Sequence, residues 1–180
     1  LDQYVGAVGC GVGEPGAVVE TTGTVMTTVE LSNDFAVNLD PEVIQGPSML
    51  PGLYYRMAVS QLGASSLQAW REYCAATMQT DELAELAARV KPGAEGLKLR
   101  GEGVIGNPAR TFEGWTDHHT PAHGARCIME SVALELNRHL SMLHACRLDT
   151  IRAAGGGARS SALLQGKAGV LGILVTHVPF

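Results

Sequence analysis

The chain has 180 residues, of which 46% are apolar, 17% charged and 5% aromatic, a composition typical of a globular protein with one domain. Its 18 acidic and 13 basic side chains give a net charge of -5, which repels a phosphate backbone and argues against nucleic acid as a partner. No apolar run approaches the roughly 20 residues that cross a bilayer, so neither a membrane span nor a signal peptide is predicted.

The ends of the chain and its cysteines suggest its context. The chain begins with Leu1 rather than methionine and ends directly after an apolar run, so both ends look cut from a longer protein. The four cysteines form no close pair, which argues against a disulfide framework and a zinc knuckle. We expect them to be reduced and mostly buried. They are Cys10, Cys74, Cys127 and Cys146.

The first third of the chain predicts strands. Runs of β-branched residues over 17–22 and 24–29 meet at Gly23, so we expect two strands around a tight turn. Residues 35–38 suggest a third strand. Six of the 22 glycines lie within residues 1–23, so chemistry that depends on the bare backbone is expected near the start.

Helices are predicted next. Apolar residues that recur every three to five positions predict a helix over 57–78, and a shorter helix is expected over 80–90, ending at Pro92. Residues 93–114 show no clear periodicity and indicate loops and short strands. Thr120 and Pro121 then form a helix start, followed by a long amphipathic stretch.

The C-terminal part predicts an alternation of strand and helix. A strand is expected over 148–153, a glycine turn over 155–157, a helix over 160–168 and a strand over 171–178. In α/β proteins, such a turn brings backbone amides and a helix N-terminus to one point, where they can hold a nucleotide or phosphate.

Two motif-like stretches favour ordinary structural interpretations. Gly11 to Gly16 matches the G-x-G-x-x-G pattern of dinucleotide-binding oxidoreductases, but a strand rather than a helix is expected after it, and Pro15 lacks an amide. A turn that enters a strand is favoured. The histidines His118, His119 and His123 have partial zinc spacing, yet a helix starts among them, so loop and cap positions are favoured.

Four segments, taken in order, resemble the C-terminal half of the FGGY carbohydrate kinases, the family of glycerol kinase, xylulokinase and ribulokinase. The segments are Asp2-Gln3 with the glycines after it, Gly16 to Thr24 ending in Thr-Thr-Gly-Thr, Phe112 to Glu130, and Gly155 to Ala168. The resemblance covers nearly the whole chain. It implies an α/β fold of the ribonuclease H-like (actin-like ATPase) class, a mixed sheet with flanking helices, as one domain over residues 1–180.

The resemblance also implies roles. Asp2 matches the catalytic base that takes a proton from the sugar hydroxyl, and Gln3 matches a side chain that binds neighbouring hydroxyls. Gly23 and Thr24 match the turn that contacts the β- and γ-phosphates of ATP. Three residues match the adenosine side of the site, namely Gly156, Gly157 and Ser160. Mg²⁺ would accompany ATP, held largely by phosphate oxygens and water, with no protein metal ligand assigned.

The implied protein is a cytoplasmic kinase that transfers the γ-phosphate of ATP to a hydroxyl of a sugar or polyol. Its missing N-terminal lobe would supply most sugar contacts, and the isolated chain is expected to be inactive. A homodimer is compatible with the family, but neither the oligomeric state nor the sugar can be read from these residues. Gly169 and residues 96–110 depart from the family pattern, which leaves open a non-catalytic nucleotide-binding or regulatory relative of sugar kinases as the alternative.

Overall fold

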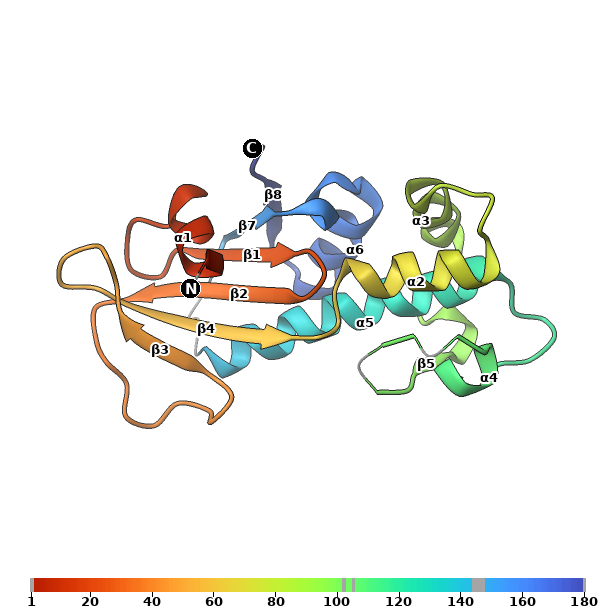
Figure 1. Cartoon of the computed structure of the whole chain (residues 1–180), viewed down its shortest axis with the longest axis horizontal. Coiled ribbons are helices and arrows are strands. Elements are labelled where there is room, and N and C mark those ends of the chain that lie inside the picture. Colours follow the sequence, from red (N-terminus) through yellow and green to blue (C-terminus); the bar gives the residue numbers. More distant parts are fainter. Residues whose placement is uncertain (1, 102, 105, 144–147, 180) are drawn as a thin grey trace.

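The computed structural model describes residues 2–101, 103–104, 106–143 and 148–179. At its centre is a six-stranded sheet in the order β3-β4-β2-β1-β7-β8 (Figure 1). The first four strands pair antiparallel, whereas β1, β7 and β8 are parallel, so the predicted mixed sheet is confirmed. The strands are β1 (Val18–Thr22), β2 (Met26–Ser32), β3 (Ile44–Pro47), β4 (Tyr54–Ser60), β7 (Thr150–Ala154) and β8 (Leu174–His177).

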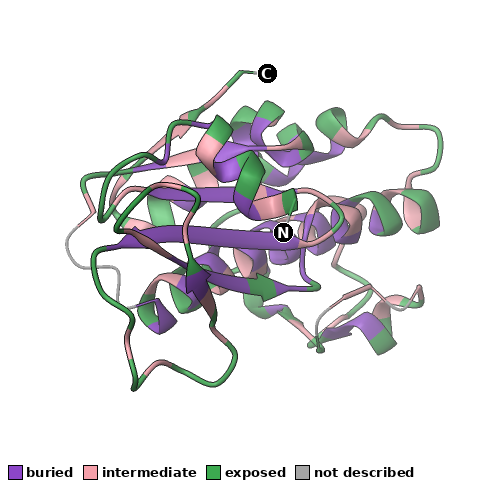
Figure 2. Ribbon diagram, turned by 60° about the vertical axis from the view of Figure 1, so that its left-hand side comes forward, coloured by how far each residue is buried: buried purple, intermediate pink, exposed green. Residues whose placement is uncertain are grey.

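Helices cover both faces of this sheet. The short helix α1 (Asp2–Gly9) lies on one face, and α5 (Pro121–Met142) and α6 (Ser161–Leu171) lie on the other (Figure 1). Strand β2 is therefore buried along its whole length, as the purple central strands of Figure 2 show. Its side chains alternate between two cores, with Met26 packed on the α5 side and Val29 on the α1 side.

The N-terminal half of α5 extends beyond the sheet and carries smaller elements around it (Figure 1). These are α2 (Ala64–Cys74), α3 (Thr80–Arg89), the 3-10 turn η1 (Ala94–Gly96), α4 (Pro108–Thr111) and the strand pair β5 (Lys98–Leu99) and β6 (Phe112–Glu113). Trp70 is fully buried at their centre, and its indole N–H donates to the Pro121 carbonyl at 2.9 Å. A Cβ at Gly124 would lie 2.5 Å from the Trp70 ring, so this glycine makes room for the tryptophan.

The start of α5 agrees with the sequence prediction. Thr120 caps it in a reciprocal arrangement with His123, whose Nδ1 accepts from the Thr120 backbone N–H at 3.2 Å. His119 accepts in the same way from Thr116 at 3.0 Å. The loop and cap positions of these histidines are thus confirmed. In the described ranges of the chain, no three histidine, cysteine or acidic side chains gather as a metal site.

Several element predictions were wrong. Residues 54–60 form strand β4 and not the start of a helix over 57–78, because they pair along their whole length with β2. Residues 35–38 form no strand, and helix α1 was not expected. Helix α6 continues to Leu171, where Gly172 caps it at φ +68, so the last strand starts later than predicted. The hairpin at Gly23 and the helix over 80–90 are confirmed.

The described cysteines are free thiols. Cys10 and Cys127 are buried and Cys74 is half-buried. Burial raises the pKa of both the Cys74 and the Cys127 thiol to about 11, which keeps them protonated and unreactive at neutral pH. Cys146 lies outside the described residues. Across the described ranges, no helix is long and apolar enough to cross a membrane.

A buried histidine should make the stability of the fold depend on pH. His139 of α5 is completely buried, and its Nδ1 lies 2.9 Å from the Thr28 hydroxyl of β2. Burial lowers the pKa of His139; the carboxylates of Glu135 and Glu42 oppose this effect, and Arg138 adds to it. The folded state therefore binds this proton less readily than the unfolded chain, whose histidine titrates near 6.5.

Because the folded pKa is the lower one, the contribution of neutral His139 to the free energy of unfolding is complete above pH 6.5. It is lost as the pH falls through the folded pKa. We expect His139→Asn to flatten the pH dependence of the urea midpoint between pH 7 and pH 5, since asparagine can still bond Thr28. The exposed His118→Asn serves as the control and should follow the wild-type curve. Equal slopes for the wild type and His139→Asn would contradict this prediction.

Candidate functional site

Two of the predicted nucleotide-binding turns meet at the carboxyl end of β1. Strand β1 ends at Thr22 and leads into a tight turn. We call residues 22–25 the phosphate hairpin; they are Thr22, Gly23, Thr24 and Val25. Strand β7 ends next to it and leads into Gly155 and the 3-10 turn η2 (Gly156–Arg159), which with Ser160 we call the adenosine turn. Because β1 and β7 are parallel neighbours, both turns lie at the same edge of the sheet.

The two turns are in contact, and glycine is needed where they touch. Gly155 adopts φ +81, and a Cβ there would lie 3.2 Å from the Thr22 carbonyl oxygen. A Cβ at Gly157 would lie 2.9 Å from the same oxygen and 2.9 Å from the Thr22 methyl. By contrast, a Cβ at Gly156 meets no atom within 4 Å. The adenosine turn therefore owes its position to close packing on Thr22.

This contrast gives a matched pair of variants. Gly157→Ala should destabilise the chain by about 1–3 kcal/mol, because overpacking against the Thr22 carbonyl forces the backbone to shift. Gly156→Ala should leave the free energy of unfolding within about 0.5 kcal/mol of wild type, as is usual for open surface positions. Urea denaturation measures both values. Equal losses in the two variants would show that the packing on Thr22 does not matter.

The start of α2 holds the other side of the phosphate hairpin. The Ala64 backbone N–H donates to the Gly23 carbonyl at 2.8 Å, and the Ser65 hydroxyl donates to the Thr24 carbonyl at 2.5 Å. A Cβ at Gly63 would lie 2.6 Å from both of these carbonyl oxygens. The hairpin is thus fixed between α2 and the adenosine turn. Sequence reasoning missed this contact, although a glycine directly before a helix is a signal for it.

A narrow cavity of about 70 Å³ lies between these elements. Three of the predicted ATP-binding residues, Gly156, Gly157 and Ser160, line it. Its other walls come from α2, α3, α5 and α6 and are mostly apolar, with two polar residues from the start of α3. These further lining residues are Gly63, Ala64, Leu67, Thr80, Asp81, Ile128, Met129, Val132 and Leu163. Sequence reasoning assigned none of them to the site, because they come from four separate helices and their flanks.

Asp2 and Gln3 are placed elsewhere. They form the start of α1, on the opposite face of the sheet from α5 and α6, and no residue of α1 lines the cavity. Asp2 is exposed and Gln3 half-buried. Tyr4 anchors this helix, because its hydroxyl lies 2.6 Å from the Ser48 hydroxyl and its ring stacks on Tyr55 at 4.7 Å between centroids. The chain thus holds its two sets of predicted site residues on different surfaces.

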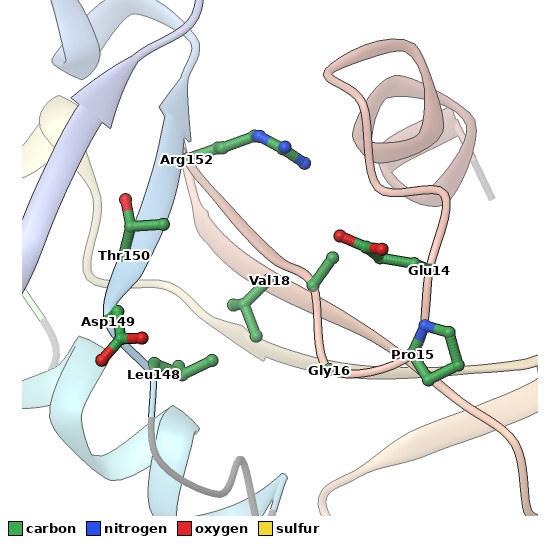
Figure 3. A pocket seen from close by; sticks show the side chains of 9 residues that line it. Glu14, Pro15, Gly16, Val18, Leu148, Asp149, Thr150 and Arg152 are labelled. Atoms are coloured by element: carbon green, nitrogen blue, oxygen red, sulfur yellow. The ribbon is translucent and has the colours of Figure 1, made fainter.

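A wider hollow of about 410 Å³ lies at the opposite end of β1 and β7 (Figure 3). It is lined by Glu14, Gly16, Asp149, Arg152 and their neighbours, at the amino ends of both strands. Ligands of open α/β sheets bind at the carboxyl ends, so this hollow is not part of the nucleotide site. Gly16, at φ +80, leads directly into β1, which confirms the strand-entry turn and removes the dinucleotide interpretation.

Comparisons with known proteins match this geometry. Residues 18–180 match the C-terminal domain of the FGGY family of carbohydrate kinases. A xylulose kinase of Staphylococcus epidermidis is 26% identical over 98% of this chain and 38% of its own length. A xylulose kinase of Escherichia coli K12 is 27% identical over 95% of this chain and 37% of its own length. The chain thus spans somewhat more than a third of these relatives.

Solved structures agree with the sequence relatives. The xylulose kinase of Rhodospirillum rubrum has a TM-score of 0.81 and 26% identity, and the match covers 97% of this chain and 37% of that one. The glycerol kinase of Plasmodium falciparum, solved with ADP, has a TM-score of 0.77 at 16% identity over 99% of this chain and 38% of its own, which shows the shared fold. The predicted ribonuclease H-like, actin-like ATPase class is therefore confirmed. The chain belongs to the FGGY family of carbohydrate kinases and forms the C-terminal domain of that family.

Proposed function

We propose that this chain is the ATP-side lobe of a kinase that transfers the γ-phosphate of ATP to a hydroxyl of a sugar or polyol. One observation carries the proposal: the phosphate hairpin and the adenosine turn pack together at Thr22 and Gly157, beside a cavity lined by Gly156 and Ser160. The turn proposed for the phosphates and the cavity proposed for adenosine would then lie at the same edge of the sheet. The curated relatives are xylulose kinases, which makes a ketose the first substrate to test.

The hairpin would suit a phosphate because the carbonyl groups of Gly23 and Thr24 already accept hydrogen bonds. Carbonyl oxygens repel an anion, and those of Gly23 and Thr24 accept hydrogen bonds from the start of α2. Thr24 is exposed, so its backbone N–H and hydroxyl are the groups that would meet the β- and γ-phosphates. Gly23 lets a phosphate approach the backbone closely.

The cavity suits a purine nucleoside in chemistry. Apolar side chains such as Leu67 and Ile128 can pack on the faces of the base, while Asp81 and Ser160 offer polar groups at its rim. Its volume of about 70 Å³ is smaller than adenosine. We therefore expect α3 to move away from α6 when the nucleotide binds, as segments do in a substantial minority of complexes.

Transfer itself would use Asp2 as the base. Its carboxylate would take the proton of the sugar hydroxyl while the hydroxyl oxygen forms a bond to the γ-phosphorus and the bond to the β-phosphate oxygen breaks, which releases ADP. Gln3 would bind neighbouring hydroxyls of the sugar. Since Asp2 lies on the α1 face, the N-terminal lobe would have to close over this face to bring sugar and phosphate together.

Mg²⁺ would neutralise the phosphate charge during transfer, with its ligands drawn mainly from phosphate oxygens and water.

We propose that the kinase acts in the cytoplasm, which the free thiols of Cys10, Cys74 and Cys127 support.

Side chains added at two open glycines test the nucleotide site. Gly156 lines the cavity, whereas Gly169 lies on α6 outside it, and a Cβ at either position meets nothing within 4 Å. In the complete kinase, Gly156→Leu should weaken ADP binding at least tenfold by calorimetry, since the leucine would fill the groove. Gly169→Leu is the matched control and should bind as wild type does. Unchanged binding by Gly156→Leu would contradict the assignment.

The isolated chain should have no kinase activity. Residues 1–180 contain the proposed base and ATP contacts but, on this proposal, lack the lobe that binds most of the sugar. An assay of sugar-dependent ADP release should therefore show no activity for the chain alone and activity when the N-terminal lobe is present. Appreciable turnover by residues 1–180 would contradict the proposal that catalysis needs the sugar contacts of the N-terminal lobe.

A further inference from the structure

Three polar side chains form a closed network beneath the proposed ATP site. Glu20 and Thr22 lie on the same face of β1, and Lys167 reaches them from α6; all three are completely buried. The Lys167 Nζ donates to Glu20 Oε1 and to Thr22 Oγ1, both at 2.6 Å. The Thr22 hydroxyl in turn donates to Glu20 Oε2 at 2.6 Å. Each group in the triangle is therefore held by the other two.

The network is not explained by stability alone. Taking an ammonium and a carboxylate out of water is costly, and apolar side chains of similar volume often stabilise a fold as well or better. Burial lowers the pKa of Lys167, which reflects this cost, while the Glu20 carboxylate opposes the effect. Such a network also fixes geometry, because its hydrogen bonds hold the elements that they join in one relative position.

The elements it joins are the two halves of the proposed ATP site. Thr22 is the first residue of the phosphate hairpin; its carbonyl packs on Gly155 and Gly157 of the adenosine turn, and its methyl group packs on Gly157. Lys167 lies in the second turn of α6, the helix that Ser160 caps and that begins directly after the adenosine turn. The ammonium therefore connects the strand that ends in one turn to the helix that begins at the other.

We propose that Lys167 is a positioning residue for phosphoryl transfer: through Glu20 and Thr22 it fixes the phosphate hairpin relative to the adenosine turn. ATP anchored by its adenosine would then present the γ-phosphate at a defined place. This inference rests on the proposed function. Displacement of a reacting group by about 1 Å can cost about 100-fold in rate, so a small shift of the hairpin should be visible in kcat.

Two substitutions at Thr22 separate hydrogen bonding from packing. Thr22→Val keeps the methyl group that packs on Gly157 but removes the hydroxyl that accepts from Lys167 and donates to Glu20. Thr22→Ser keeps the hydroxyl and removes the methyl. In the complete kinase, we expect Thr22→Val to lower kcat about tenfold and Thr22→Ser to lower it less, because only Thr22→Val breaks the network. The affinity for adenosine, measured by calorimetry, should be unchanged in both.

The outcomes distinguish the inference from the proposed function. A loss of kcat in Thr22→Ser but not in Thr22→Val would assign the effect to packing and overturn the network's role, as would wild-type kcat in both variants. If Thr22→Val does not fold, the double variant Glu20→Leu, Lys167→Met removes both charges and should fold with the same loss of kcat; wild-type kcat there would overturn the inference. Absence of sugar-dependent ADP release in the wild type would refute the proposed function, and the inference with it.

Discussion

Replacing Asp2 by asparagine in the complete kinase is expected to lower kcat by about 100- to 10,000-fold, the usual contribution of a general base. Asparagine has nearly the same shape as aspartate but cannot take the proton of the sugar hydroxyl. Because Asp2 lies in α1, away from the cavity that would hold adenosine, the affinity for ATP should not change. Loss of kcat without loss of ATP binding is the signature of a residue that acts on the sugar side.

The control for this variant is Asp117→Asn. Asp117 is an exposed carboxylate in the loop before α5 and does not line the cavity, so its replacement removes the same charge from the chain without touching the site. Steady-state kinetics with saturating sugar and ATP give kcat for both variants. If Asp2→Asn keeps the kcat of wild type, Asp2 is not the base.

Replacing Lys167 by methionine is expected to destabilise the chain by about 3–5 kcal/mol, because it leaves the Glu20 carboxylate buried without its ion-pair partner. That is a large share of the 5–15 kcal/mol that holds a typical domain together. Urea denaturation of the chain, followed by circular dichroism, measures the loss. Thr22 would still donate to Glu20, so the carboxylate would keep one hydrogen bond.

Removing both charges should reverse most of this loss. In the double variant Glu20→Leu, Lys167→Met no charge remains buried, and two apolar side chains fill a similar volume. We expect its free energy of unfolding to return to within about 1–2 kcal/mol of wild type. A double variant as unstable as Lys167→Met would show that the loss comes from poor packing of methionine and not from the unpaired carboxylate.

The sequence predicts those elements whose local pattern agrees with their tertiary partners. The β-branched residues on both sides of Gly23 favour strands, and the structure pairs them as β1 and β2. Thr120 and Pro121 start a helix by local capping, and α5 begins there. The glycine turn between β7 and α6 was also predicted from its local sequence, the three consecutive glycines at 155–157.

The failures occur where tertiary contacts override the local pattern. Residues 57–60 were included in the helix predicted over 57–78, but they belong to β4, which pairs with β2 along its whole length and is mostly buried. Helix α1 contains Gly6 and ends at Gly9, which disfavours a helix locally. Its stability comes from Tyr4 and Ala7, which are buried against the sheet, and no local signal shows this.

The candidate site was predicted in part for a similar reason. Gly156, Gly157 and Ser160 are adjacent in sequence, so one turn reveals them together. Gly63 and Asp81 reach the same cavity from other elements, and only the folded chain shows that they do. The network of Glu20, Thr22 and Lys167 was also missed, although a lysine on an apolar helix face and a glutamate within a β-branched strand are signals of a buried ion pair.

The most direct test of the central claim is phosphate transfer by the complete protein. ATP labelled in its γ-phosphate is incubated with Mg²⁺ and with D-xylulose, other ketoses and glycerol in turn, and the label in the sugar fraction is measured. We predict transfer to at least one of these acceptors, with stoichiometric ADP, and its loss in Asp2→Asn. Binding of ATP without transfer to any acceptor would contradict the kinase assignment and indicate the non-catalytic nucleotide-binding relative instead.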